Sequence, residues 1–173
     1  MRTLRLFLFV AALVLLVGSI GSAQDFDPNY YYRITNGWQK GKSLDVVNDG
    51  DKNNKLQLAD TGNFSGQMWK ITKLEDGYFR FTNGWQKDKS LDVLNEGEKD
   101  QLQLAKTENV TGQMWKLKML ADGYFGLSCK FQGEDKSIDV INDGDKNNRI
   151  HLIKTGNFTG QMWKFEKTNV KAE

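Results

Sequence analysis

The chain has 173 residues, enough for one domain with a single hydrophobic core. Its 24 Lys and Arg residues are interspersed with 22 Asp and Glu residues, so it lacks the basic surface that nucleic-acid binding requires. Its single cysteine, Cys129, excludes an intrachain disulfide, and the fold must therefore be stabilised by packing alone.

The first 23 residues have the features of a secretory signal peptide. Arg2 and Arg5 precede an apolar stretch over residues 6–20, and small residues follow it. This stretch is shorter than the roughly 20 residues that span a bilayer, which disfavours the alternative of an uncleaved membrane anchor. We expect residues 1–23 to be removed and residues 24–173, with 22 basic and 22 acidic side chains, to be secreted without membrane insertion, into the extracellular space or the periplasm.

The mature chain consists of three copies of one unit, at about residues 31–77, 78–123 and 124–170. Two motifs recur in the same order in every copy. Ser-Leu/Ile-Asp-Val occurs at 43–46, 90–93 and 137–140, and Gly-Gln-Met-Trp-Lys occurs at 66–70, 112–116 and 160–164. A fixed period of 46 to 48 residues is typical of repeat architectures.

Each copy contains four short segments with a two-residue alternation of apolar and polar side chains. In the first copy they cover residues 31–35, 42–48, 55–59 and 67–74, separated by turns rich in Gly, Asn and Asp. Tight turns at 75–77 and 121–123 join the copies, and each ends in a glycine that accepts a positive φ. A propeller needs at least about four such units. Three units of four strands predict an all-β, twelve-stranded barrel with pseudo-threefold symmetry, whose closure removes exposed strand edges.

A Gln-x-Trp signature occurs once in each copy, at Gln67-Met68-Trp69, Gln113-Met114-Trp115 and Gln161-Met162-Trp163. Together with the Leu/Ile-Asp-Val segment, this signature resembles that of the ricin-B-type β-trefoil lectins over the whole mature chain. The resemblance implies a β-trefoil in which the signature lies in the last strand of each copy and the three tryptophans are buried around the pseudo-threefold axis.

The resemblance also implies a carbohydrate site in each copy. The aspartate of the Asp-Val segment would accept hydrogen bonds from two sugar hydroxyls, and the signature glutamine would orient it. An asparagine three residues beyond each aspartate is within reach of the same pocket, although all these residues also suit local turns. The candidate carbohydrate-binding residues are Asp45, Asn48, Gln67, Asp92, Asn95, Gln113, Asp139, Asn142 and Gln161.

The sequence departs from the family where an aromatic ring stacks on the sugar. The positions of that ring hold Ala59, Ala105 and Ile153. The asparagine that precedes the signature glutamine in the family is replaced by Gly66, Gly112 and Gly160. Without this ring and this amide, the chain does not form the galactose-type pocket in the way that members of that family do. The loop before each aspartate offers replacement rings for stacking, which alternatively cap the barrel or pack on a neighbouring loop: Trp38, Trp85 and Phe131.

We expect no enzyme activity, no cofactor and no metal. His151 stands where the other copies have glutamine, and aspartates on three separate copies do not form the carboxylate pair of glycoside hydrolysis. Acidic turns at 49–53 and 143–147 are followed by neither the glycine nor the glutamate of a calcium loop. N-glycosylation sequons begin at Asn63, Asn109 and Asn157.

The sequence therefore favours a secreted lectin with up to three equivalent sites that bind glycans or polysaccharide. The alternative is a non-lectin trefoil that binds a protein partner, as an inhibitor or host-interaction factor, through a loop that breaks the symmetry. Residues 130–136 and the extension at 24–30 are the candidates for such a loop. Near-identity of the copies favours the lectin, because a single-loop inhibitor does not require threefold repetition.

Overall fold

The computed structural model describes residues 25–50, 53–97, 100–142, 144 and 147–172. The expected signal peptide and parts of the acidic turns lie outside these ranges. No helix within the described ranges has the length and apolar character needed to cross a membrane.

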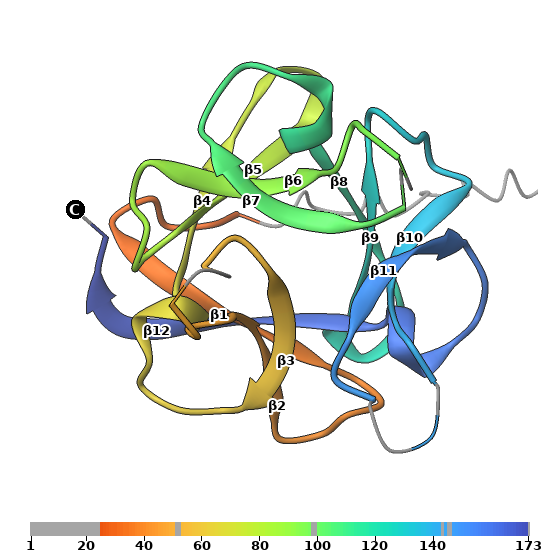
Figure 1. Ribbon diagram of the computed structural model, residues 1–173, viewed down its shortest axis with the longest axis horizontal. Helices are drawn as coiled ribbons and strands as arrows, with labels where there is room; N and C mark the ends of the chain where they lie inside the picture. The colour runs from red at the N-terminus through yellow and green to blue at the C-terminus, as the bar shows by residue number, and fades with distance from the viewer. Residues whose placement is uncertain (1–24, 51–52, 98–99, 143, 145–146, 173) are drawn as a thin grey trace, which may run out of the picture.

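The described residues form twelve strands, four in each copy (Figure 1). The first copy contains β1 (Tyr30–Asn36), β2 (Lys42–Val46), β3 (Leu56–Asp60) and β4 (Trp69–Lys73). The second contains β5 (Tyr78–Asn83), β6 (Lys89–Val93), β7 (Leu102–Lys106) and β8 (Trp115–Met119). The third contains β9 (Phe125–Cys129), β10 (Lys136–Val140), β11 (Ile150–Lys154) and β12 (Trp163–Lys171).

Short 3-10 turns precede the last strand of each copy and join the copies. The turns before the last strand are η1 (Ser65–Gln67), η3 (Thr111–Gln113) and η5 (Thr159–Gln161). The turns that join the copies are η2 (Glu75–Gly77) and η4 (Ala121–Gly123). The expectation that the whole signature lies in the last strand is therefore wrong. The glutamine ends a 3-10 turn and only the tryptophan begins the strand, because the glutamine side chain bonds back to the preceding loop.

Six strands close into a ring. β1 pairs with β4, β4 with β5, β5 with β8, β8 with β9, β9 with β12, and β12 returns to β1. The last of these pairings joins the two ends of the chain, with Ile34 opposite Phe165. The closed ring leaves no edge among its six strands, as the repeat pattern predicts.

The remaining strands form three hairpins, β2–β3, β6–β7 and β10–β11, which Figure 1 shows as three lobes. Backbone hydrogen bonds connect each hairpin to the next in a cycle. They run from Leu58 N to Asn148 O (2.7 Å), from Leu104 N to Asn54 O (2.7 Å) and from Leu152 N to Asp100 O (2.8 Å). The lobes therefore stabilise one another.

The signature tryptophans are fully buried in one core, as expected. Each indole N–H donates to a backbone carbonyl of the aspartate strand in its own copy. The distances are 3.1 Å from Trp69 to Leu44, 3.0 Å from Trp115 to Leu91 and 3.0 Å from Trp163 to Ile138. A satisfied N–H allows the whole indole to contribute apolar burial, and it fixes the hairpin on the barrel.

The connecting turns need two consecutive residues in the left-handed region. Asp76 and Gly77 have φ of 56° and 73°, and Asp122 and Gly123 have φ of 56° and 74°. Asp is among the few side chains that tolerate this region and glycine adopts it freely, which explains the repeated Asp-Gly.

Candidate functional site

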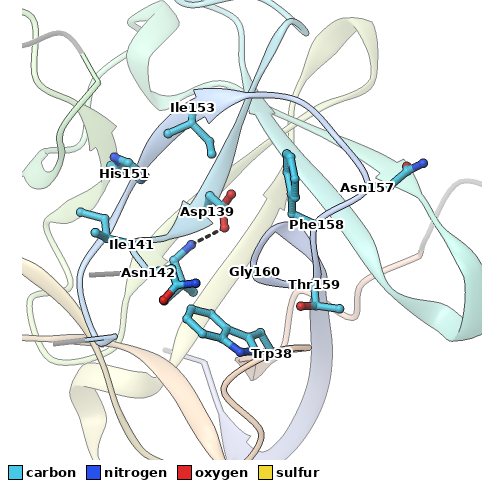
Figure 2. A pocket seen from close by; sticks show the side chains of 11 residues that line it. Trp38, Asp139, Ile141, Asn142, His151, Ile153, Asn157, Phe158, Thr159 and Gly160 are labelled. Carbon is cyan, nitrogen blue, oxygen red and sulfur yellow. Dashed lines mark hydrogen bonds between the residues drawn. The ribbon is translucent and has the colours of Figure 1, made fainter. Parts of the chain in front are cut away.

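Each copy carries a pocket where its aspartate strand meets the 3-10 turn before the signature. Pocket 1, around Asp45, has a volume of about 370 Å³. Pocket 2, around Asp92, and pocket 3, around Asp139, have volumes of about 580 Å³ and 590 Å³. Figure 2 shows pocket 3 from close by, with the Asp139 carboxylate near its centre.

The aspartate carboxylate is held in the same way in the first and third copies. In pocket 1, Asp45 Oδ1 accepts from Val46 N (2.8 Å) and Oδ2 accepts from Gln67 Nε2 (3.2 Å). In pocket 3, the corresponding distances to Asp139 are 2.7 Å from Val140 N and 3.1 Å from Gln161 Nε2. Two carboxylate oxygens offer about four acceptor positions, so acceptor capacity remains for a ligand.

The signature glutamine is a positioning residue. Gln67 is fully buried, and its Nε2 also donates to Asp60 O (2.9 Å) while its Oε1 accepts from Gly62 N (2.9 Å). Gln113 and Gln161 make the equivalent loop contacts. With both ends of the amide occupied, the glutamine fixes the carboxylate rather than presenting a free group to a ligand.

The glycine before each signature glutamine makes room for the carboxylate. A Cβ added at Gly66 would lie 2.5 Å from Asp45 Oδ1, and it would be closer still to the aspartate at Gly112 and Gly160. The family's asparagine cannot occupy these positions while the carboxylate keeps this orientation. Glycine replaces the family's asparagine here because the aspartate carboxylate occupies the space that a side chain would need.

Burial raises the pKa of Asp45 and of Asp92 above the ordinary value for aspartate. Hydrogen bonds from Gln67 and Val46 to Asp45 act in the opposite direction but are the smaller effect. A carboxylate that has lost part of its hydration is stabilised by additional hydrogen-bond donors.

The three predicted asparagines lie at the pockets as the sequence suggests. Asn48 lines pocket 1, Asn95 lines pocket 2 and Asn142 lines pocket 3. Their part in binding remains a prediction.

Trp38, Trp85 and Phe131 line pockets, but each belongs to the copy that follows the pocket it lines. Trp85 lines pocket 1, Phe131 lines pocket 2 and Trp38 lines pocket 3. The loops that carry them bond to the preceding signature, for example through Gly37 N to Met162 O (2.8 Å) and Gly84 N to Met68 O (2.7 Å). Each ring therefore lines a pocket of the neighbouring copy, and its stacking on a sugar remains a prediction.

Sequence reasoning missed a second apolar residue in each pocket, at the middle of each sequon. Phe64 is 60% exposed, Val110 41% and Phe158 56%, and they line pockets 1, 2 and 3. The sequence did contain a signal for these residues, because an apolar side chain recurs at the same place in an otherwise polar turn of each copy. The sequon asparagines Asn63, Asn109 and Asn157 also line pockets 1, 2 and 3.

One further residue distinguishes pocket 3 from the other two pockets. His151 lines pocket 3, and burial lowers its pKa, which favours the neutral imidazole. The loop at 130–136, expected to break the symmetry, supplies Phe131 to pocket 2 as its counterparts do elsewhere. Among the described residues, no group of three or more His, Cys, Asp or Glu side chains is arranged to hold a metal ion.

A closed six-stranded barrel with three hairpin lobes and a pocket in each copy defines a β-trefoil. The family model described as ricin-type beta-trefoil lectin domain-like matches residues 22–107, which span the first copy and most of the second. Over these residues the chain is similar to that family, and the resemblance seen in the sequence is confirmed.

Solved structures confirm the fold. The designed threefold symmetric protein ThreeFoil is 24% identical, with a TM-score of 0.67 over 80% of this chain and 99% of that one. A ricin B-like lectin from Macrolepiota procera, solved with lactose, is 14% identical, with a TM-score of 0.67 over 84% and 100%. An exo-beta-1,3-galactanase from Clostridium thermocellum is 28% identical, with a TM-score of 0.65 over 80% of this chain and 30% of that enzyme. No curated protein sequence matches the chain.

Proposed function

We propose that this protein is a secreted, non-catalytic lectin whose three pockets are separate glycan-binding sites. The observation that carries the proposal is a buried carboxylate beside a buried glutamine, bordered by exposed apolar side chains, which occurs in all three copies.

The distribution of exposed apolar side chains supports a ligand at the pockets. Seven large hydrophobic side chains of the described residues are exposed, and five of them line the pockets: Phe64, Trp85, Val110, Phe131 and Phe158. Apolar groups gathered around a polar acceptor suit a carbohydrate, since sugars present C–H faces to rings and hydroxyls to a carboxylate.

Three sites on one rigid body favour multivalent binding. A single shallow pocket makes few contacts, and those contacts must offset the entropy and desolvation lost on binding. Simultaneous engagement of a repetitive glycan surface raises the apparent affinity by about 10² to 10⁴ where the geometry fits. The family of residues 22–107 and the lactose complex of the Macrolepiota lectin support a sugar ligand. The proposal of secretion rests on the sequence of residues 1–23.

A glycan array and a polysaccharide column test the proposal with the mature protein. We expect the combined variant Asp45→Ala, Asp92→Ala and Asp139→Ala to lose retention, because each pocket then lacks its acceptor. The matched control is Asp60→Ala, whose side chain is 95% exposed and lines none of the three pockets. Circular dichroism checks that both variants fold. Retention of the triple variant at the wild-type level would contradict the proposal.

A further inference from the structure

One wall of each pocket comes from its own copy. In pockets 1 and 3 this wall is a phenyl ring packed against a glycine. A Cβ added at Gly156 would lie 2.5 Å from Phe158 Cε2, and at Gly62 it would lie closer still to Phe64. Each glycine therefore lets the ring lie against the backbone, which orders a side chain that is otherwise exposed. Pocket 2 has Glu108 and Val110 at these two positions and lacks the ring.

The opposite wall comes from the following copy and is tied to the pocket floor. Asn36 Nδ2 donates to Gly160 O (2.9 Å), and Asn36 Oδ1 accepts from Trp38 N (3.0 Å). Asn83 connects Gly66 O to Trp85 N in the same way, at 2.9 Å and 3.0 Å. The asparagine thus holds the tryptophan loop against the glycine that faces the carboxylate.

Both walls of pocket 3 lie next to its acceptor. Figure 2 shows Phe158 and Trp38 on different sides of Asp139, with Asn142 between the carboxylate and the indole. A pyranose ring that enters this space edge-on directs hydroxyls to the carboxylate and turns one face to each aromatic side chain.

A sugar held by both faces must be apolar on both faces. A pyranose whose ring hydroxyls are all equatorial has axial C–H groups above and below the ring. An axial hydroxyl, as at C4 of galactose or C2 of mannose, places a polar group against one wall, where it loses water without gaining a hydrogen bond.

We propose that pockets 1 and 3 are two-sided aromatic clamps that select all-equatorial pyranoses, such as β-linked glucosyl or xylosyl residues, over galactose- and mannose-type sugars. This inference rests on the proposed lectin function and adds the ligand class. Pocket 2, with valine as one wall, is the weaker and less selective site.

The test isolates pocket 3 in an Asp45→Ala, Asp92→Ala background. Cellotetraose and β-1,4-galactotetraose, which differ in the configuration at C4, are titrated by calorimetry. We expect cellotetraose to bind at least about tenfold more tightly. Trp38→Ala and Phe158→Ala should each weaken cellotetraose binding about tenfold and bring the ratio of the two affinities towards one, whereas Trp38→Phe should keep most of the preference.

A gain-of-function variant provides an independent check. In an Asp45→Ala, Asp139→Ala background, the double change Glu108→Gly and Val110→Phe should give pocket 2 the missing wall and raise its affinity for cellotetraose. Equal or galactose-type preference in pocket 3, or a ratio that does not respond to loss of either wall, would overturn the clamp. A galactose-type glycan that requires Asp139 but not Trp38 would overturn the clamp and leave the lectin function standing. Failure of every glycan to bind the wild type would overturn both.

Discussion

At the scale of single residues, burial at the pocket floor disfavours the charged form of two of the aspartates. Burial raises the pKa of Asp45 and Asp92, so the native state holds the carboxyl proton more tightly than the unfolded chain does. Ionisation of these groups therefore weakens the fold as the pH rises through the raised pKa. A charged group that costs stability in two of the three copies, beside a glycine that leaves room for it, is expected where the group meets a ligand.

We predict that Gly160→Ala disrupts pocket 3. The new methyl group would overlap the Asp139 carboxylate, so we expect a loss of about 1–3 kcal/mol in unfolding free energy and loss of glycan binding by this pocket. Urea denaturation and calorimetry measure the two effects. The matched control is Gly126→Ala, whose added Cβ meets no atom within 4 Å. Equal stability of the two variants would contradict the prediction.

At the scale of elements, the loop after the first strand of each copy connects neighbouring copies. Asn36 and Asn83 anchor this loop in two of the three places. The third place has Cys129, whose Sγ lies 3.4 Å from Gly112 O. Burial raises the pKa of this thiol to about 11, so it stays neutral and is a weaker donor than an amide. The lone cysteine is thus a substitution at a structural anchor.

We predict that Cys129→Asn stabilises the protein by about 0.5–1.5 kcal/mol, because the amide restores a full hydrogen bond to Gly112 and an acceptor for the loop that carries Phe131. Thermal and urea unfolding measure the change. Cys129→Ser is the control, since its hydroxyl cannot reach both partners as the amide does. If the asparagine variant is the less stable of the two, the anchor interpretation is wrong.

At the scale of the whole molecule, the barrel is closed by its two ends. β1 and β12 pair over six positions, and the same closure brings Trp38 from the first copy to pocket 3 in the last. Pocket 3 is therefore complete only when the barrel is closed.

We expect a chain that ends at Met162 to lose cooperative unfolding, because removal of β12 opens the ring and removes the contacts of Phe165 with Phe26, Phe81 and Phe125. A chain that ends at Thr168 keeps these contacts and should unfold in one transition. Urea titration followed by tryptophan fluorescence distinguishes the two. A cooperative transition in the shorter chain would show that the ring does not depend on β12.

The amino-acid sequence by itself determined the repeat, the number of strands and the β-trefoil, because a motif that recurs three times reports its own local structure. It also located the aspartates, which follow a recognisable strand pattern. Only the tertiary structure decided that Phe64 and Phe158 line the pockets. It also decided that each pocket is lined by an aromatic residue of the next copy, which is Trp85, Phe131 or Trp38. The physical reason is that a repeat pattern describes neighbours along the chain, whereas the walls of these pockets become neighbours only when the barrel closes.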